Sequence, residues 1–311
     1  MKPFRLIPDV TTIAFMRFRY LAFALTIVLS LVSVVSLATR GLELGIDFSG
    51  GLLLEVKGPG PADLAAMRGS LAGIDAGEFT LQEFGSPEEV LIRIQPRSTD
   101  QAEIQRTTDK VRAAIGSEYE LRRTEFIGPQ VSAELLRNGL AAALVSVLAI
   151  AVYVWFRFEW QFGVSALLTT FHDVLGTFGL FSITGMQFDL TIVAAILTIA
   201  GYSINDTVVV FDRIRENLRR YKTMDLRELI DLSVNQTLSR TVLTSGTTLV
   251  TALALMIFGG PVLSGFATAF VFGILIGTYS SIFVASALLM YTPSVRIGKF
   301  APSAEQRAQT G

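Results

Sequence analysis

Long apolar runs separated by short polar connections dominate the chain. Six of these runs can cross a bilayer as helices, because about 20 apolar residues span a hydrocarbon core of about 30 Å. The predicted spans are residues 20–37, 136–156, 161–183, 190–211, 241–258 and 264–290. Basic residues precede the first run, as in a signal peptide, but the run is longer than a usual signal core and Ala38-Thr39-Arg40 makes a poor cleavage site. We therefore expect a retained first span.

Residues 38–135, between the first two spans, carry a different pattern. The predicted strands are residues 52–57, 79–84, 90–95 and 118–126, and the predicted helices are residues 61–72 and 99–115, the second capped by Ser98 or Thr99. The order βαββαβ is the ferredoxin-like plan. The expected fold class is an α-helical polytopic membrane protein whose six transmembrane helices carry a ferredoxin-like α+β domain. We interpret this domain as a binding or lever module, with a plain spacer as the alternative.

The composition supports this interpretation and excludes several kinds of site. Of the 311 residues, 51% are hydrophobic and 17% are charged, which is too apolar for an ordinary soluble protein. There are no cysteines, so disulfides and thiolate metal sites are excluded, and the single histidine, His172, excludes a multi-histidine metal cluster. We expect no metal and no cofactor. The net charge of −1 gives no indication of nucleic-acid binding, and we expect none.

The short connections predict the orientation of the spans. Lysines and arginines occur in segment 1–19, the turn 157–160, the connection 212–240 and the tail, whereas the loops 185–189 and 259–263 have none. All basic segments fall on one side, so both termini should be cytoplasmic and the domain 38–135 extracytoplasmic.

The membrane domain should comprise residues 136–298, followed by a disordered tail at 299–311. Within it, apolar residues at helical spacing in 212–240 predict one or two amphipathic helices along the cytoplasmic interface. A solvated loop with partial helix is the alternative.

An acidic residue interrupts the fourth span. Asp206 lies about two turns from the charged end of this span, where an ionisable group costs about 2.5–3.5 kcal/mol on insertion scales. A functional role is therefore the default hypothesis. Thr198 and Tyr202 precede it at four-residue steps on one helix face, and Asn205 flanks it.

A basic residue opens the fifth span at the same end of the membrane. Arg240 begins a polar stripe that continues with Thr244 one turn later. The depths of the two spans permit contact between Arg240 and Asp206, which we predict to be a functional pair. The alternatives are an inert buried salt bridge, or an arginine that only marks the membrane boundary.

Two further spans carry patterns of their own. His172 and Asp173 lie near the middle of the third span, where a polar pair acts either in a relay or as hydrogen-bonding glue between helices. In the sixth span small residues recur every fourth position, at Gly265, Ala269, Gly273, Gly277 and Ser281. This spacing predicts close helix packing.

Four motifs of this chain resemble the SecF subunits of the SecD/SecF family in the bacterial protein-export machinery. They are LGIDFSGG at 44–51, FHD at 171–173, GYSINDTVVVFDRIREN at 201–217, and LSRT at 238–241 followed by Thr244-Ser245. The resemblance extends to about Lys299. Its first motif contains Gly45, Asp47, Gly50 and Gly51, which we expect to have a structural role.

The resemblance implies a function and a set of partners. The family belongs to the resistance-nodulation-division superfamily, and such a chain forms half of a twelve-span unit with SecD in the bacterial inner membrane. That unit uses the proton-motive force to help preproteins leave the SecYEG channel after the SecA motor has acted, with YajC and YidC as possible further partners and lipids around it. Asp206 and Arg240 match the family's proton-path residues.

The same resemblance implies a transport subunit rather than an enzyme. Two alternatives stay open at this point, a half-size proton-coupled exporter of lipid or small molecules, and a passive scaffold for SecD. An intramembrane aspartyl protease using Asp173 and Asp206 would need the two carboxylates to share a proton. The chain lacks the sequence context that such proteases show.

Overall fold

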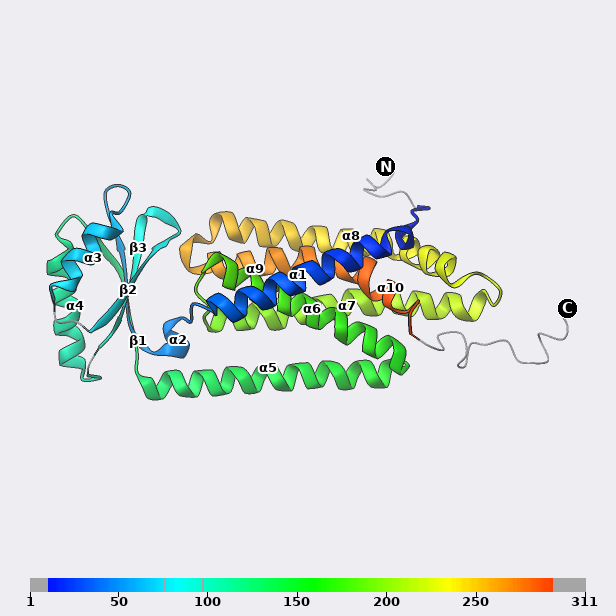
Figure 1. Cartoon of the computed structure of the whole chain (residues 1–311), viewed down its shortest axis with the longest axis horizontal. Helices are drawn as coiled ribbons and strands as arrows, with labels where there is room; N and C mark the ends of the chain where they lie inside the picture. The colour runs from blue at the N-terminus through cyan, green and yellow to red at the C-terminus, as the bar shows by residue number, and fades with distance from the viewer. Residues whose placement is uncertain (1–10, 75–76, 97, 293–311) are drawn as a thin grey trace, which may run out of the picture.

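The computed structural model describes residues 11–74, 77–96 and 98–292 and consists of a long helical bundle with a small sheet domain at one end (Figure 1). The sheet has four antiparallel strands in the order β2-β3-β1-β4. Helices α3 and α4 lie on the sheet face that points away from the bundle. The predicted ferredoxin-like domain on a polytopic membrane protein is confirmed.

The elements of the sheet domain follow the predicted order closely. They are β1 (Gly51–Lys57), α3 (Leu64–Ala72), β2 (Glu78–Phe84), β3 (Ser86–Gln95), α4 (Gln101–Ile115) and β4 (Glu120–Ile127). Alternation along β1 places Leu52, Leu54 and Val56 in the core beneath α3 and α4. The predicted cap of α4 is wrong: the side chain of Asp100 accepts from Ala102 N, because Asp100 is the residue directly before the first helical turn.

In the described part of the chain, six helices have the length and hydropathy of membrane spans, in agreement with the predicted six. They are α1 (Arg19–Arg40), α5 (Pro129–Arg157), α6 (Trp160–Thr184), α7 (Leu190–Arg220), α8 (Leu226–Phe258), and a sixth made of α9 (Gly260–Tyr279), the π-helical η2 (Ser280–Ala285) and α10 (Ser286–Leu288). Because α5 begins at Pro129, the boundary expected at residue 136 lies inside this helix. The segments 1–10 and 299–311 of the predicted termini lie outside the described residues.

The connection 212–240 differs from the prediction. Instead of separate amphipathic helices, it consists of the ends of α7 and α8, which form a helical hairpin with a short turn at 221–225. No proline or glycine interrupts the chain between Gly201 and the turn, so nothing stops α7 at the end of its apolar run. The apolar residues that predicted amphipathic helices, including Leu218, Leu229 and Val234, pack together in the hairpin.

The membrane helices form a buried centre and an exposed periphery. Over the most apolar 18 residues of each span, α6, α7 and the sixth span are half or more buried, whereas α1, α5 and α8 present large apolar side chains outward. The predicted close packing of the sixth span is confirmed. A Cβ added to Gly273 would lie 2.4 Å from Ile199, and one added to Gly277 would lie 3.3 Å from Ser203. Small residues thus bring α9 against α7 near Asp206.

Candidate functional site

Asp206 lies on the buried side of α7, and its carboxylate contacts hydroxyl groups on two other elements. The residue is 4% exposed. Thr241 Oγ1 of α8 donates to Oδ1 at 3.0 Å, and Ser281 Oγ of η2 donates to Oδ2 at 3.1 Å. Both donors are neutral, so a negative charge here would be hydrogen-bonded but would lack an adjacent counter-ion among the described residues. A buried carboxyl avoids the cost of such a charge by binding a proton.

Arg240 does not make the predicted contact with Asp206. It is exposed on α8 and forms no ion pair with the carboxylate, and the neighbouring Thr241 faces the carboxylate instead. Successive residues of an α-helix are about 100° apart, so a helix that presents Thr241 to Asp206 must point Arg240 elsewhere. An inert buried salt bridge is therefore absent from this arrangement, and the role of Arg240 stays a prediction.

Asp173 on α6 is a second buried carboxylate and is 0% exposed. Its Oδ2 accepts from Ser203 Oγ of α7 at 2.6 Å and from Ser280 Oγ of η2 at 2.7 Å. His172 Nδ1 lies 3.0 Å from Oδ1, while its Nε2 is buried and has no hydrogen-bond partner in the described part of the chain. A ring that carries a proton on Nδ1 can donate to this carboxylate oxygen. Asp173 therefore joins three elements, whereas His172 contacts its own neighbour.

Two adjacent serines of η2 serve the two carboxylates. Ser280 donates to Asp173 and Ser281 donates to Asp206, and each hydroxyl also lies close to the Gly277 carbonyl oxygen, at 3.1 and 2.7 Å respectively. Single π-helical turns within α-helices are frequent at functional sites. The carboxylates of α6 and α7 are thus connected through one short segment of the sixth span.

The other polar residues predicted on the fourth and fifth spans divide between the interior and the outer surface. Tyr202 donates inward to a serine hydroxyl of α8 at 3.2 Å. Thr198, Asn205 and Thr244 are exposed, and the two threonines bond to backbone carbonyls of their own helices. The single polar face predicted for the fourth span is wrong, because each four-residue step turns about 40° around the helix. Two such steps amount to about 80° around the helix axis, so Thr198 lies at the surface while Asp206 lies in the interior.

The residues predicted to form a structural motif connect the sheet domain to the membrane helices. Asp47 lies in the short helix α2 (Ile46–Ser49), and its Oδ2 accepts from Leu190 N at 2.9 Å. This bond caps the first turn of α7. Beside it, Gly45 N donates to the Phe188 carbonyl oxygen at 2.8 Å. The chain entering the sheet domain is therefore fixed to the start of the helix that carries Asp206.

Two glycines then turn the chain into β1. Gly50 has φ +69° and Gly51 has φ +114°, both in the region that glycine favours. A Cβ on Gly51 would also lie 2.8 Å from the Ile94 carbonyl oxygen of β3. Both the backbone conformation and the close approach of β3 require glycine at this turn.

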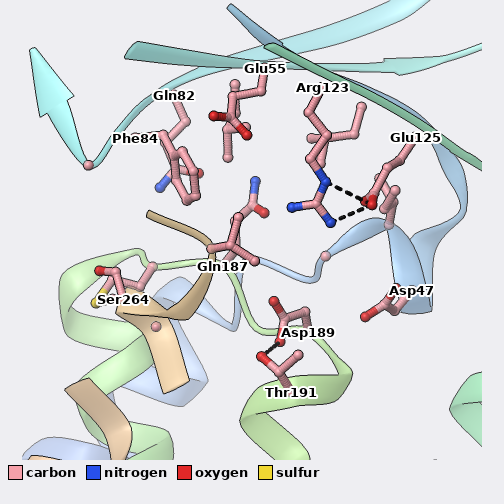
Figure 2. A pocket seen from close by; sticks show the side chains of 18 of the residues that line it. Asp47, Glu55, Gln82, Phe84, Arg123, Glu125, Gln187, Asp189, Thr191 and Ser264 are labelled. Atoms are coloured by element: carbon pink, nitrogen blue, oxygen red, sulfur yellow. Dashed lines mark hydrogen bonds and ion pairs between the residues drawn. The ribbon is translucent and has the colours of Figure 1, made fainter. Parts of the chain in front are cut away.

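A cavity of about 710 Å³ separates the uncovered face of the sheet from the ends of α7 and α9 (Figure 2). Glu55, Arg123 and Glu125 face it from the sheet, and Gln187 and Asp189 face it from the loop between α6 and α7. Arg123 Nε donates to Glu125 at 2.8 Å, while burial raises the pKa of Glu55 above its ordinary value.

Comparison with known proteins assigns the chain to a family. Residues 107–294 match the family model described as protein export membrane protein SecD/SecF, C-terminal, and residues 35–57 match the SecD/SecF GG motif. The chain belongs to the SecD/SecF family.

Within the SecD/SecF family the similarity is to SecF subunits. The chain is 44% identical to protein translocase subunit SecF of Rickettsia akari, over 92% of this chain and 94% of that protein. It is 45% identical to the subunit of Vibrio alginolyticus, over 92% of each chain.

The solved structures of SecDF extend this similarity to three dimensions. The crystal structure of SecDF, a translocon-associated membrane protein from Thermus thermophilus, matches with a TM-score of 0.84 and 36% identity. A second SecDF structure, in a super-membrane-facing form, matches with a TM-score of 0.66 and 35% identity. The two matches include 92% and 93% of the residues of this chain. They include only 39% of each SecDF chain.

The SecD/SecF GG motif of this chain contains the turn at Gly50–Gly51 and the capping residue Asp47. The resemblance located these residues, but it did not indicate the hydroxyl partners of the carboxylates. Ser281 stood out in the sequence only as one of the small residues of the sixth span. No periodicity in the sequence indicates that Ser280 and Ser281 reach two different carboxylates, because this depends on the π-helical turn of η2.

Proposed function

We propose that this chain acts with a SecD-type subunit to couple proton movement across the membrane to late steps of preprotein translocation through a SecYEG-type channel. The observation that carries the proposal is the pair of buried carboxyl groups, Asp173 and Asp206, on the central helices. Their partners are hydroxyl groups and one imidazole. Ionisable groups inside a membrane bundle mark proton or ion pathways.

The hydroxyl partners allow each carboxyl group to gain or lose a proton in place. Ser281 Oγ lies 3.1 Å from Asp206 and 2.7 Å from the Gly277 carbonyl oxygen. When Asp206 is ionised, Ser281 donates to it. When Asp206 is protonated, its own proton is donated to Ser281 Oγ, and the serine proton turns to the Gly277 carbonyl oxygen. Protonation therefore changes the hydrogen bonds of η2.

The outer face of α7 and α8 supports the presence of a partner subunit. Arg240 is exposed there, along with Asn205, Thr198 and Thr244, on helices that cross the membrane. Charged side chains in membrane spans face a bundle interior or a polar cavity rather than lipid. A SecD-type bundle packed on this face would enclose Arg240 and complete the polar interior. The fact that this chain spans 39% of the SecDF chain supports such a partner.

The sheet domain provides a route from the carboxyls to the translocating preprotein. Asp206 lies on α7, and the first turn of α7 is capped by Asp47 of the segment that leads into β1. A shift of α7 would therefore be passed to the sheet domain through this bond. The first span begins after η1 (Phe15–Phe18), and the sixth span ends with α10. Both elements lie at the end of the membrane bundle opposite the sheet domain. We propose that this end is cytoplasmic in the bacterial inner membrane, where SecA acts, and that the sheet domain is extracytoplasmic.

The test is preprotein export into inverted membrane vesicles that contain the SecD-type partner and the channel, with and without a proton gradient. One charge moving through the potential contributes about 2.3 kcal/mol per 100 mV, so loss of the carrier should abolish stimulation by the gradient. We expect Asp206→Asn to lose this stimulation and still copurify with the partner. Glu216→Gln removes an exposed carboxylate from the same helix and should keep it.

The outcomes separate the proposed role from its alternatives. Full stimulation of the Asp206→Asn variant would refute the proton-coupled role and support a passive scaffold. Loss of copurification together with loss of stimulation would indicate a structural role for Asp206. Asp173→Asn in the same assay tests whether the second carboxyl takes part. We propose no bond-breaking chemistry for this chain.

A further inference from the structure

A basic cavity lies at the end of the bundle opposite the sheet domain. It has a volume of about 480 Å³, and it lies between the end of α5, the start of α6 and the last turns of α7. Its lining residues are Phe156, Arg157, Phe158, Glu159, Arg215, Arg219 and Lys222. The lining thus contains four cationic residues and one acidic residue, and Asp212 beside it pairs with Arg157 and Arg215. We propose that this cavity binds the phosphate headgroup of an anionic membrane phospholipid.

The arginines of this cavity are held in place by an aromatic ring. Phe158 is buried, and the guanidinium carbons of Arg157 and Arg215 lie 4.9 and 5.4 Å from the centre of its ring. Arg157 also donates to both oxygens of Asp212, at 2.6 and 2.5 Å. Guanidinium groups that are fixed in this way lose little freedom when they bind an anion.

Arg215 retains a hydrogen-bond donor that the protein does not use. Its Nη1 donates to the Arg157 carbonyl oxygen at 3.2 Å, but its Nε is buried and has no partner among the described residues. Arg215 also lies four residues before Arg219, and like charges at this spacing on a helix repel each other. A phosphate in the cavity would accept the unused donor and offset the repulsion.

Aromatic side chains place the cavity at the level of lipid headgroups. Trp155, Phe156 and Trp160 are 68%, 86% and 48% exposed, and they lie directly before and after the turn that lines the cavity. Trp side chains are enriched at the boundary between hydrocarbon and water, because the ring is apolar and its N–H is polar. Basic pockets between membrane helices at this depth bind anionic headgroups, and the exposed aromatic rings give the acyl chains an apolar surface.

The experiment is native mass spectrometry of the full chain in detergent, titrated with dioleoylphosphatidylglycerol. Arg215→Gln and Lys222→Gln should each weaken retention of this lipid about fivefold, because a basic residue at a membrane surface contributes roughly that factor. Arg17→Gln removes an equal charge from an exposed position at the same end of the bundle and should leave retention unchanged. Phosphatidylcholine should bind all four proteins weakly and equally.

The result that would overturn the proposal is equal retention of phosphatidylglycerol by the wild type and both cavity variants. Because Lys222 lies beyond the end of α7 and is exposed, its variant remains informative even if Arg215→Gln fails to fold. A separate titration uses inorganic phosphate against bound phosphatidylglycerol. Displacement of the lipid by phosphate at equal concentration would show a site for a soluble anion and would also overturn the lipid assignment. Persistence of the lipid supports it.

Discussion

The contact between α1 and α6 provides a quantitative test of the packing. Gly179 of α6 faces Ser33 of α1 so closely that an added Cβ would lie 2.0 Å from Oγ, 2.4 Å from Cβ and 2.8 Å from Cα of that serine. Rotation of the serine side chain can relieve the contact with Oγ, but the contact with Cα can be relieved only by movement of the backbone. The contact with Cβ has to open from 2.4 Å to an ordinary distance of about 3.4 Å, and rotation leaves Cβ in place, so Gly179→Ala forces α1 outward by roughly 1 Å.

The expected cost follows from a comparison of two substitutions. Overpacking of this kind costs about 1–3 kcal/mol, while replacing a helical glycine with alanine gains up to about 1 kcal/mol from helix propensity. Gly246 of α8 has no atom within 4 Å of an added Cβ, so Gly246→Ala has the propensity gain alone. The propensity contribution cancels between the two variants. Gly179→Ala should thus be less stable than Gly246→Ala by about 1–3 kcal/mol.

The chain offers a direct assay for this contact, because it contains no cysteine. Ser36 Oγ and Ser182 Oγ lie 2.8 Å apart, one turn from Gly179 on the same interface. The double variant Ser36→Cys with Ser182→Cys should form a disulfide readily, and more slowly when Gly179→Ala is added. Unfolding in denaturant gives the stability difference. Equal stability of the two alanine variants, with unchanged cross-linking, would show that the reasoning about α1 is wrong.

Three further predictions concern the functional residues. Asp47→Ala should lower the unfolding free energy by about 0.5–2 kcal/mol through loss of the cap at Leu190, whereas Asp47→Asn keeps an acceptor and should cost less in the same unfolding assay. Burial raises the pKa of Glu55, so its contribution to stability is present below the ordinary value of 4.5 and is lost as pH rises through the raised pKa. In that pH window, the amide exchange rate in β1 should therefore rise more steeply with pH than the intrinsic exchange rate does. Glu55→Gln should remove this extra rise. If the variant kept it, Glu55 would be excluded as its source. Ser281→Ala should cost about 1 kcal/mol, and a double-mutant cycle with Asp206→Ala should assign most of that cost to their hydrogen bond; additive effects would contradict the assignment.

Much of the fold was predictable because its signals are periodic. Apolar runs of sufficient length predicted all six spans. The strand pattern at residues 52–57 gave β1 nearly correct bounds, whereas the pattern at 90–95 predicted only the second part of β3, which begins at Ser86. The hairpin of α7 and α8 was not predictable from hydropathy, because the pattern changes from apolar to amphipathic where the helix leaves the apolar run. Helix continuity depends on backbone bonds and on the absence of breakers, and a change of polarity affects neither.

The candidate site was only partly predictable for a geometric reason. Asp206 was identified because an ionisable group within an apolar span costs free energy. Asp173 was identified because it lies near the middle of the third span. The partner of Asp206 was misassigned, because sequence spacing gives the height of Arg240 along α8 but not the rotation of α8 about its axis. A rotation of about 100° decides whether Arg240 or Thr241 faces Asp206. Neighbouring helices set that rotation by packing, and no local pattern encodes it.

The positions of the two carboxyls suggest how a protonation event could act over distance. Asp206 lies 16 residues along α7 from Leu190, about 24 Å at 1.5 Å per residue, and that first residue is bound by Asp47. A helix transmits an axial displacement over this length without large loss, whereas side-chain contacts alone would dissipate it. Displacement of α7 also requires α9 to follow, since Gly273 is packed against Ile199. The widened turn at η2 is the place where α9 can yield, and it is there that Ser280 and Ser281 contact both carboxyls.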